Sequence, residues 1–118
     1  MLVVILDGSA TEGRLMEPVE RLRRWTVNGE RIMEDGCGAR ALDRRSLALA
    51  RIAALIAIGG AGPSFGAEVE AAIADGATDQ EIVDVLACVL PLVGMARVVA
   101  AAPMIALALG YDDLLEPS

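Results

Sequence analysis

The side chains most suited to chemistry lie beside a glycine-rich break, residues 59–64, between two apolar stretches. Arg51 is the single charged residue in positions 46–67, and it shares one line of a helix with Arg44. A guanidinium at the edge of an apolar core requires a carboxylate, a carbonyl or a bound anion as its partner. We therefore expect Arg51 to form a salt bridge, within or between subunits, or else to anchor an anionic ligand.

Nucleophilic and metal chemistry have few candidate residues in this chain. Ser64 has no histidine to activate it, since the sequence contains none, and a helix cap or a turn is its expected role. Cys37 and Cys88 stand too far apart for a metal-ligand motif, and we expect reduced thiols in a cytoplasmic chain. The sequence therefore predicts neither a metal site nor a cofactor.

Two helices that flank the break must position these side chains. Asp43 is a suitable N-cap for a helix over residues 44–58, because its carboxylate can accept an early backbone N–H. The next helix is expected over residues 65–75, with Gly76 just beyond its end. The residues of this second helix expected to face the core are Val69, Ala72 and Ile73.

The remaining helices follow from capping residues and helix breakers. Residues 78–81, Thr-Asp-Gln-Glu, form a capping-box pattern that opens a helix reaching about residue 90. Pro91 and Gly94 are expected to bend or restart the chain. The other expected helical segments cover residues 16–27, residues 29–35, a stretch that ends near residue 101, and residues 103–110, opened by Pro103.

Composition predicts an all-α domain that associates with copies of itself. The apolar fraction is 55%, and a helical bundle of 118 residues cannot bury so much apolar surface alone. The net charge of −7 argues against nucleic acid as a partner, and no clean apolar run of about 20 residues predicts a membrane span. We expect a cytoplasmic protein with a flexible arm over residues 1–13, a single domain over residues 14–110 and an acidic tail over residues 111–118.

Three segments resemble the carboxymuconolactone decarboxylase family, which includes the AhpD-like alkyl hydroperoxide reductase proteins. They are Leu42-Asp43 at the start of the long helix, AAIADGATDQEI over residues 71–82, and PLVGMAR over residues 91–97. The resemblance covers roughly residues 40–110. It implies an all-α, AhpD-like helical bundle and an intertwined homo-oligomer, commonly a trimer or a hexamer.

The sequence departs from the peroxidatic members of that family. Those members place a CxxC motif in the break and a histidine four residues after the second cysteine. In this chain Ala61 and Ser64 take the cysteine positions, and Glu68 takes the histidine position. The family's relay glutamate falls on Ala48 or Leu49. Thiol peroxidase chemistry needs an attacking thiolate, a resolving thiol and a proton relay, so a peroxiredoxin-type activity is disfavoured.

A decarboxylase-type reaction makes different demands, which three side chains could meet. Arg51 or Arg97 could hold a substrate carboxylate, and Glu68 could protonate the product carbanion. Each also has a structural interpretation: an ion pair for Arg51, a helix cap or bridge for Arg97, and a surface position for Glu68. The residues expected to line the accompanying pocket beside the break are Ser64, Phe65 and Met95.

Three functions from different classes therefore stay open. The first is a lyase or decarboxylase-type enzyme with an altered site, acting on a small anionic organic substrate. The second is a non-catalytic oligomer that binds a hydrophobic or anionic small molecule or a partner protein. The third is a redox protein that pairs Cys37 with Cys88.

Overall fold

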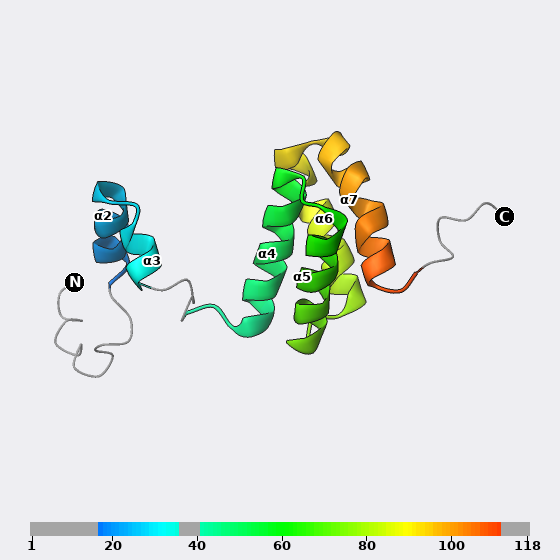
Figure 1. Ribbon diagram of the computed structural model, residues 1–118, viewed down its shortest axis with the longest axis horizontal. Helices are drawn as coiled ribbons and strands as arrows, with labels where there is room; N and C mark the ends of the chain where they lie inside the picture. The colour runs from blue at the N-terminus through cyan, green and yellow to red at the C-terminus, as the bar shows by residue number, and fades with distance from the viewer. Residues whose placement is uncertain (1–16, 36–40, 112–118) are drawn as a thin grey trace. The chain divides into compact units, whose positions relative to one another are not determined.

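The computed structural model describes residues 17–35 and 41–111, which contain six α-helices and no strand. The helices fall into two compact units, and each unit is described by itself. One unit holds α2 (Pro18–Val27) and α3 (Arg31–Asp35). The other holds α4 (Arg44–Ile58), α5 (Gly62–Ala74), α6 (Asp79–Val93) and α7 (Met95–Ala108) (Figure 1). The all-α prediction is confirmed for the described residues.

Two further expectations from the sequence concern the ends of the chain and the absence of a membrane span. The arm predicted over residues 1–13 and nearly all of the predicted tail lie outside the described residues. Within the described ranges, no helix combines the length and the apolar character that crossing a membrane requires.

α2 is an amphipathic helix, and none of its residues is buried. Val19 and Leu22 are both 61% exposed. Asn28 ends the helix, and its side-chain oxygen accepts the Glu30 N–H at 3.0 Å. Both helices predicted before the break are therefore present, although α3 begins two residues later than expected.

α4 begins and ends as its sequence predicts. The Asp43 carboxylate accepts the Ser46 N–H at 2.7 Å, and hydrogen bonding from Ser46 lowers the pKa of Asp43. At the other end Gly59 has a φ of 75°, in the left-handed region that favours glycine. The Gly60 N–H donates to the Leu55 carbonyl at 2.9 Å, which satisfies an acceptor of the last turn.

α5 begins at Gly62, three residues earlier than predicted. Pro63 lies in the first turn, where its fixed φ suits a helix start, and Ala61 is the N-cap. The break is therefore shorter than expected. The interpretation of Ser64 as a cap or turn residue is wrong, because Ser64 lies inside the helix.

The other end of α5 follows the glycine rule. Gly76 has a φ of 98°, and the Ala77 N–H donates to the Ala72 carbonyl at 2.9 Å, as in a Schellman motif. Val69 and Ala72 are fully buried, as predicted. Ile73 is 45% exposed, contrary to the prediction. It follows the buried Ala72 directly, and one residue turns the side chain by about 100° around the helix axis, away from the core.

The capping box predicted for α6 is present. Thr78 Oγ1 accepts the Glu81 N–H at 3.1 Å, and Glu81 Oε1 accepts the Thr78 N–H at 3.0 Å. These two bonds satisfy orphan donors at the start of the helix. α6 then continues to Val93, beyond the expected end near residue 90.

Two prolines that suggested break points lie inside helices. α6 runs through Pro91, and α7 runs through Pro103 as one continuous helix, so the separate helix predicted from Pro103 is wrong. A proline removes one bond to the carbonyl four residues earlier. Those residues are Ala87 and Val99, and both are exposed, so water can replace the lost donor. Gly94, with a φ of 91°, is the actual break between α6 and α7.

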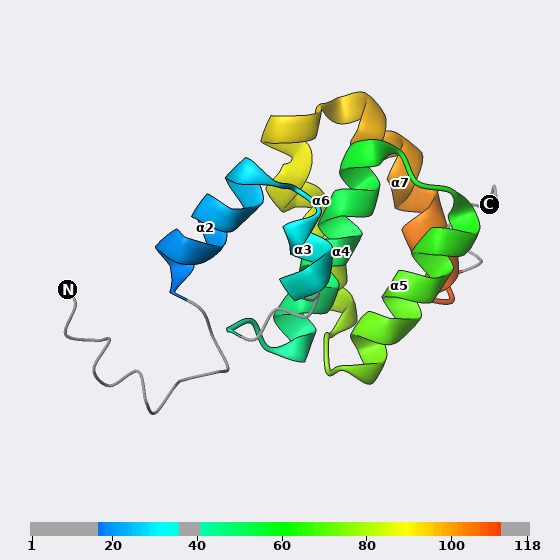
Figure 2. The same cartoon turned by 60° about the vertical axis from the view of Figure 1, so that its left-hand side comes forward.

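The four helices of the second unit pack in a ring around one apolar core. α4 packs against α5 and α6, and α7 completes the ring between α5 and α6 (Figure 1, Figure 2). The largest fully buried side chains are Phe65, Ile52, Ile56, Ile82, Ile105 and Val69. Because α4 and α5 are direct neighbours, polar side chains at the edge of their contact can meet.

Candidate functional site

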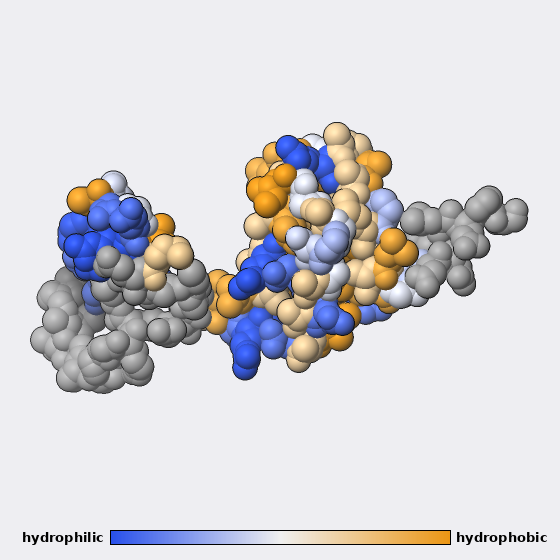
Figure 3. All heavy atoms as spheres, in the orientation of Figure 1, coloured by the Kyte–Doolittle hydropathy of each residue, from blue (hydrophilic) through white to orange (hydrophobic). Residues whose placement is uncertain are grey.

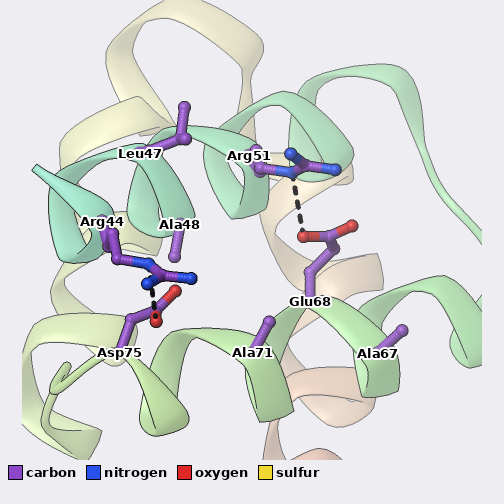
Figure 4. Close-up of a pocket in the computed structure, with 8 residues that line it drawn as sticks. All are labelled: Arg44, Leu47, Ala48, Arg51, Ala67, Glu68, Ala71 and Asp75. Carbon is purple, nitrogen blue, oxygen red and sulfur yellow. Dashed lines mark hydrogen bonds and ion pairs between the residues drawn. The ribbon is translucent and has the colours of Figure 1, made fainter. Parts of the chain in front are cut away.

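A groove of about 320 Å³ lies between α4 and α5 (Figure 4). Its lining residues are Arg44, Leu47, Ala48 and Arg51 from α4, and Ala67, Glu68, Ala71 and Asp75 from α5 and its C-cap. Ala48 and Ala71 lie between two ion pairs, one toward each end of the groove. The groove therefore combines a small apolar middle with charged ends.

Arg51 and Glu68 form the ion pair at one end of the groove. Nε of Arg51 lies 3.2 Å from Oε1 of Glu68. Of the alternatives that the sequence left open for Arg51, the structure contains the salt bridge within one subunit. The Arg51 side chain is 59% exposed, and an exposed pair of this kind contributes only about 0.2–1 kcal/mol to stability. Loss of the pair should therefore leave the fold intact.

Arg44 and Asp75 form the ion pair at the other end. Nε of Arg44 lies 3.6 Å from Oδ1 of Asp75, and the Arg44 side chain is 87% exposed. The pairs 44–75 and 51–68 have the register of two antiparallel neighbouring helices. Sequence reasoning placed Arg44 on one line with Arg51 but missed Asp75, which reads as a turn residue after the end of its helix. Only the packing of α5 beside α4 makes the two residues neighbours.

In both ion pairs of the groove, the recorded contact joins Nε of the arginine to one carboxylate oxygen. A guanidinium also carries two terminal amino groups, which can bind a carboxylate in bidentate fashion. Within the described ranges, no recorded hydrogen bond or ion pair occupies those groups of Arg44 or Arg51. An incoming organic anion could therefore bind either arginine without displacing its acidic partner.

Arg97 lies outside the groove, at the C-terminal end of α4. Its Nη1 occupies the space beside Gly59 that a Cβ atom on that glycine would need. Gly59 follows Arg51 by eight residues, or about 12 Å along the helix axis. A cation is favourable there because the last carbonyls of α4 carry partial negative charge. The structure thus brings Arg51 to Glu68 but leaves Arg97 apart from both.

The residues predicted to line a pocket beside the break lie away from this groove. Phe65 is fully buried in the core, Met95 is 62% exposed at the start of α7, and Ser64 is exposed in the first turn of α5. None of the three contributes to the groove lining. Their part in a binding site stays a prediction.

The described residues contain neither a pair of thiols nor a metal site. Cys88 is an exposed free thiol on α6, whereas Cys37 lies outside the described residues, so their pairing stays a prediction. In the ranges that the structure describes, no cluster of three His, Cys, Asp or Glu residues could hold a metal ion.

Two further polar contacts involve the first turn of α6 and lie outside the groove. Arg45 Nη1 lies 3.1 Å from Glu81 Oε2, which joins α4 to α6. Tyr111 Oη donates a hydrogen bond to the Asp79 carboxylate, and this bond raises the pKa of Tyr111. Because neither contact includes a groove residue, these side chains provide controls for variants of the groove.

The fold and the groove define a class of all-α protein, in which a ring of four helices carries a charged groove between its first two members. The carboxymuconolactone decarboxylase family model matches residues 22–106, which is more than half of the chain. The chain therefore belongs to the carboxymuconolactone decarboxylase family, and the resemblance seen in its sequence is confirmed. No curated protein and no solved structure matches it.

Proposed function

We propose that this family member has an altered site and binds a small organic anion in the groove between α4 and α5. The observation that supports the proposal is the 3.2 Å contact between Arg51 Nε and Glu68 Oε1, which sets a cation beside an acid. Arg51 holds the ligand carboxylate through its terminal amino groups. Glu68 then lies next to the atoms that adjoin that carboxylate.

Decarboxylation is the reaction that this arrangement suits. The bond between the substrate carboxylate and its neighbouring carbon breaks, CO₂ leaves, and the electron pair moves into a conjugated carbonyl of the substrate. Glu68, as a carboxylic acid, donates a proton to that carbon, and water restores the proton to Glu68. Arg51 orients the departing carboxylate so that its neighbouring carbon lies beside Glu68.

Release of CO₂ from unsaturated lactone carboxylates tests this activity. Glu68→Gln keeps the size of the side chain but cannot donate a proton in the same way, so we expect kcat to fall about a hundred-fold. Arg51→Gln should raise KM about ten-fold through the lost charge-assisted hydrogen bonds. Arg45→Gln changes an arginine outside the groove and should leave both constants unchanged. An unchanged kcat in Glu68→Gln would remove Glu68 as the acid.

A non-catalytic binding protein is the second candidate function. The observation that favours it is the likeness of the two groove pairs. Each joins an arginine of α4 to an acid of α5 or its C-cap through Nε, and nothing in this geometry distinguishes one of them as catalytic. Such a protein binds a hydrophobic or anionic small molecule, or a partner protein, without turnover. Aromatic acids or acyl ligands should then raise the melting temperature with no product formed. No stabilisation across a broad ligand panel would count against this candidate.

Thiol peroxidase activity is not part of the proposal. Ala61 is the N-cap of α5 and Ser64 lies in its first turn, so neither position at the break supplies a thiol. The sequence contains no histidine for a proton relay. We expect the protein to consume no organic hydroperoxide in the presence of a dithiol, and Cys88→Ser is the control for any residual consumption.

We further propose that the protein assembles as a homo-oligomer, a trimer or a hexamer. The support is the exposure of large apolar side chains at the end of the ring where α4 stops and α6 meets α7. Figure 3 shows hydrophobic residues at this end with hydrophilic ones among them. Leu92 is 87% exposed there, Ile58 is 70% exposed and Met95 is 62% exposed. A second copy that covers this surface gains about 25 cal/mol for each Å² of apolar area removed from water.

Light scattering after size-exclusion chromatography measures the assembly. Leu92→Asp should lower the molar mass, because the charge would have to be buried at the contact. Leu107→Asp, in the last turns of α7, is the matched control and should keep the mass of the wild type. A wild-type protein with the mass of one chain would contradict the proposal.

A further inference from the structure

The second ion pair gives the groove a cation at each end, and this carries an inference that rests on the anion-binding part of the proposed function. Arg44–Asp75 repeats Arg51–Glu68 seven residues along both helices. We propose that the groove binds an elongated organic dianion, a straight-chain α,ω-dicarboxylate, with one carboxylate on Arg51 and the other on Arg44 (Figure 4).

The spacing of the two arginines sets the length of the ligand. Seven residues correspond to about 10 Å along α4, and to nearly two full turns, so both side chains leave the same side of the helix. Figure 4 draws both side chains extending in the same direction from α4, so the spacing of the guanidinium groups stays close to that of the Cα atoms. The terminal amino groups of the two guanidinium ions are therefore two carboxylate sites separated by roughly one medium-length chain.

The lining between the arginines sets the chemistry of the middle of the ligand. Leu47 and Ala48 from α4 and Ala71 from α5 present methyl and methylene groups there. An unsubstituted hydrocarbon chain loses no hydrogen bonds to water on such a surface, whereas a hydroxylated chain would. The volume of about 320 Å³ lies at the lower end of the range for small-molecule sites.

The accessibility of the charges in the groove favours a dianionic ligand over a zwitterionic one. Asp75 could in principle hold an ammonium group at the same end, but its carboxylate faces Arg44 and its side chain is 28% exposed. The Arg44 side chain is 87% exposed against 28% for Asp75, so the cation is the more accessible of the two charges. Carboxylates that bind the terminal amino groups leave both acid–Nε contacts in place.

Calorimetric titration of the wild type with matched ligands tests the inference. The ligands are octanoate, suberate and the ω-amino acid of the same length, followed by the dicarboxylates from succinate to dodecanedioate. We expect suberate to bind about five-fold more tightly than octanoate, the gain from one exposed ion pair. Affinity should peak among the medium-length dicarboxylates, and the ω-amino acid should bind no better than octanoate.

Two neighbouring arginines provide the variant and its control. Arg44→Gln should abolish the advantage of suberate over octanoate, whereas Arg45→Gln should keep that advantage because Arg45 lies outside the groove. An advantage that survives Arg44→Gln, or an ω-amino acid that binds as well as suberate, would overturn the dianion. If octanoate binds through Arg51 but suberate binds no tighter, only this inference fails. If neither ligand binds the wild type, the anion-binding function fails with it.

Discussion

The guanidinium of Arg97, on α7, occupies the space into which a side chain on Gly59, at the end of α4, would project. Gly59 also has a φ of 75°, where a Cβ atom costs about 1–2 kcal/mol. The atom nearest to that position is the far end of a flexible side chain, so an added methyl group displaces Arg97 rather than the backbone.

Gly59→Ala should therefore lower the free energy of unfolding by the strain of the backbone plus about 0.3–1 kcal/mol for the lost cation at the helix end. Gly76→Ala is the matched control, because Gly76 has a φ of 98° with open space around its Cβ position. Its free energy of unfolding should fall by the backbone strain alone. Urea unfolding of both variants, with and without Arg97→Ala, measures the difference. If the excess loss at Gly59 persists without Arg97, the contact does not contribute.

The Thr78 hydroxyl is expected to matter more for stability than the Ser64 hydroxyl. Thr78 Oγ1 accepts a backbone N–H at the start of α6, so Thr78→Ala should cost about 1 kcal/mol of unfolding free energy. In the described structure, the Ser64 side chain makes no capping hydrogen bond for α5, and Ser64→Ala should change stability by less than about 0.5 kcal/mol. Denaturant unfolding of the two variants compares them, and equal losses would contradict the capping geometry.

Tyr111 is the single tyrosine of the chain, so absorbance reports its ionisation directly. The hydrogen bond to Asp79 keeps the proton on the phenol and raises the pKa of Tyr111 above the ordinary value of 10.0. Because the folded pKa is the higher one, the stabilisation is full below pH 10.0 and is lost as the pH rises through the folded value. Asp79→Asn should return the midpoint toward 10.0, whereas Asp84→Asn, elsewhere on α6, should leave it raised.

Phe65 is expected to act through the core rather than through a ligand. Its side chain is fully buried, so Phe65→Ala should cost about 3–5 kcal/mol, and Phe65→Leu, which keeps most of the volume, less than about 1.5 kcal/mol. Met95 is 62% exposed, and Met95→Ala should cost less than about 0.5 kcal/mol in the separated chain. Chemical unfolding measures all three. A Phe65→Leu variant that is stable but no longer binds any ligand would instead support a role of Phe65 in a site.

Local signals in the sequence determined most helix ends, because capping is decided within a few residues. Asp43, Thr78 and Glu81 make the hydrogen bonds that their types and spacing predict, and Gly59 and Gly76 take the positive φ values that end their helices. The local signals failed at the prolines. A helix can continue through Pro91 or Pro103 when the surrounding packing holds it and the freed carbonyl faces water, and neither condition is visible in the sequence.

By itself the sequence determined the all-α class, the family and the importance of Arg51 as a lone cation that needs a partner. Tertiary structure alone decided which partner it has and what lies beside it. Glu68 and Asp75 reach Arg51 and Arg44 only because α5 packs antiparallel against α4 in one particular register. Arg97 lies beside Gly59 at the break itself, about 12 Å along α4 from Arg51, so it does not join the same site. Contacts between helices depend on how whole apolar faces pack, and the sequence spacing of single polar residues does not encode that packing.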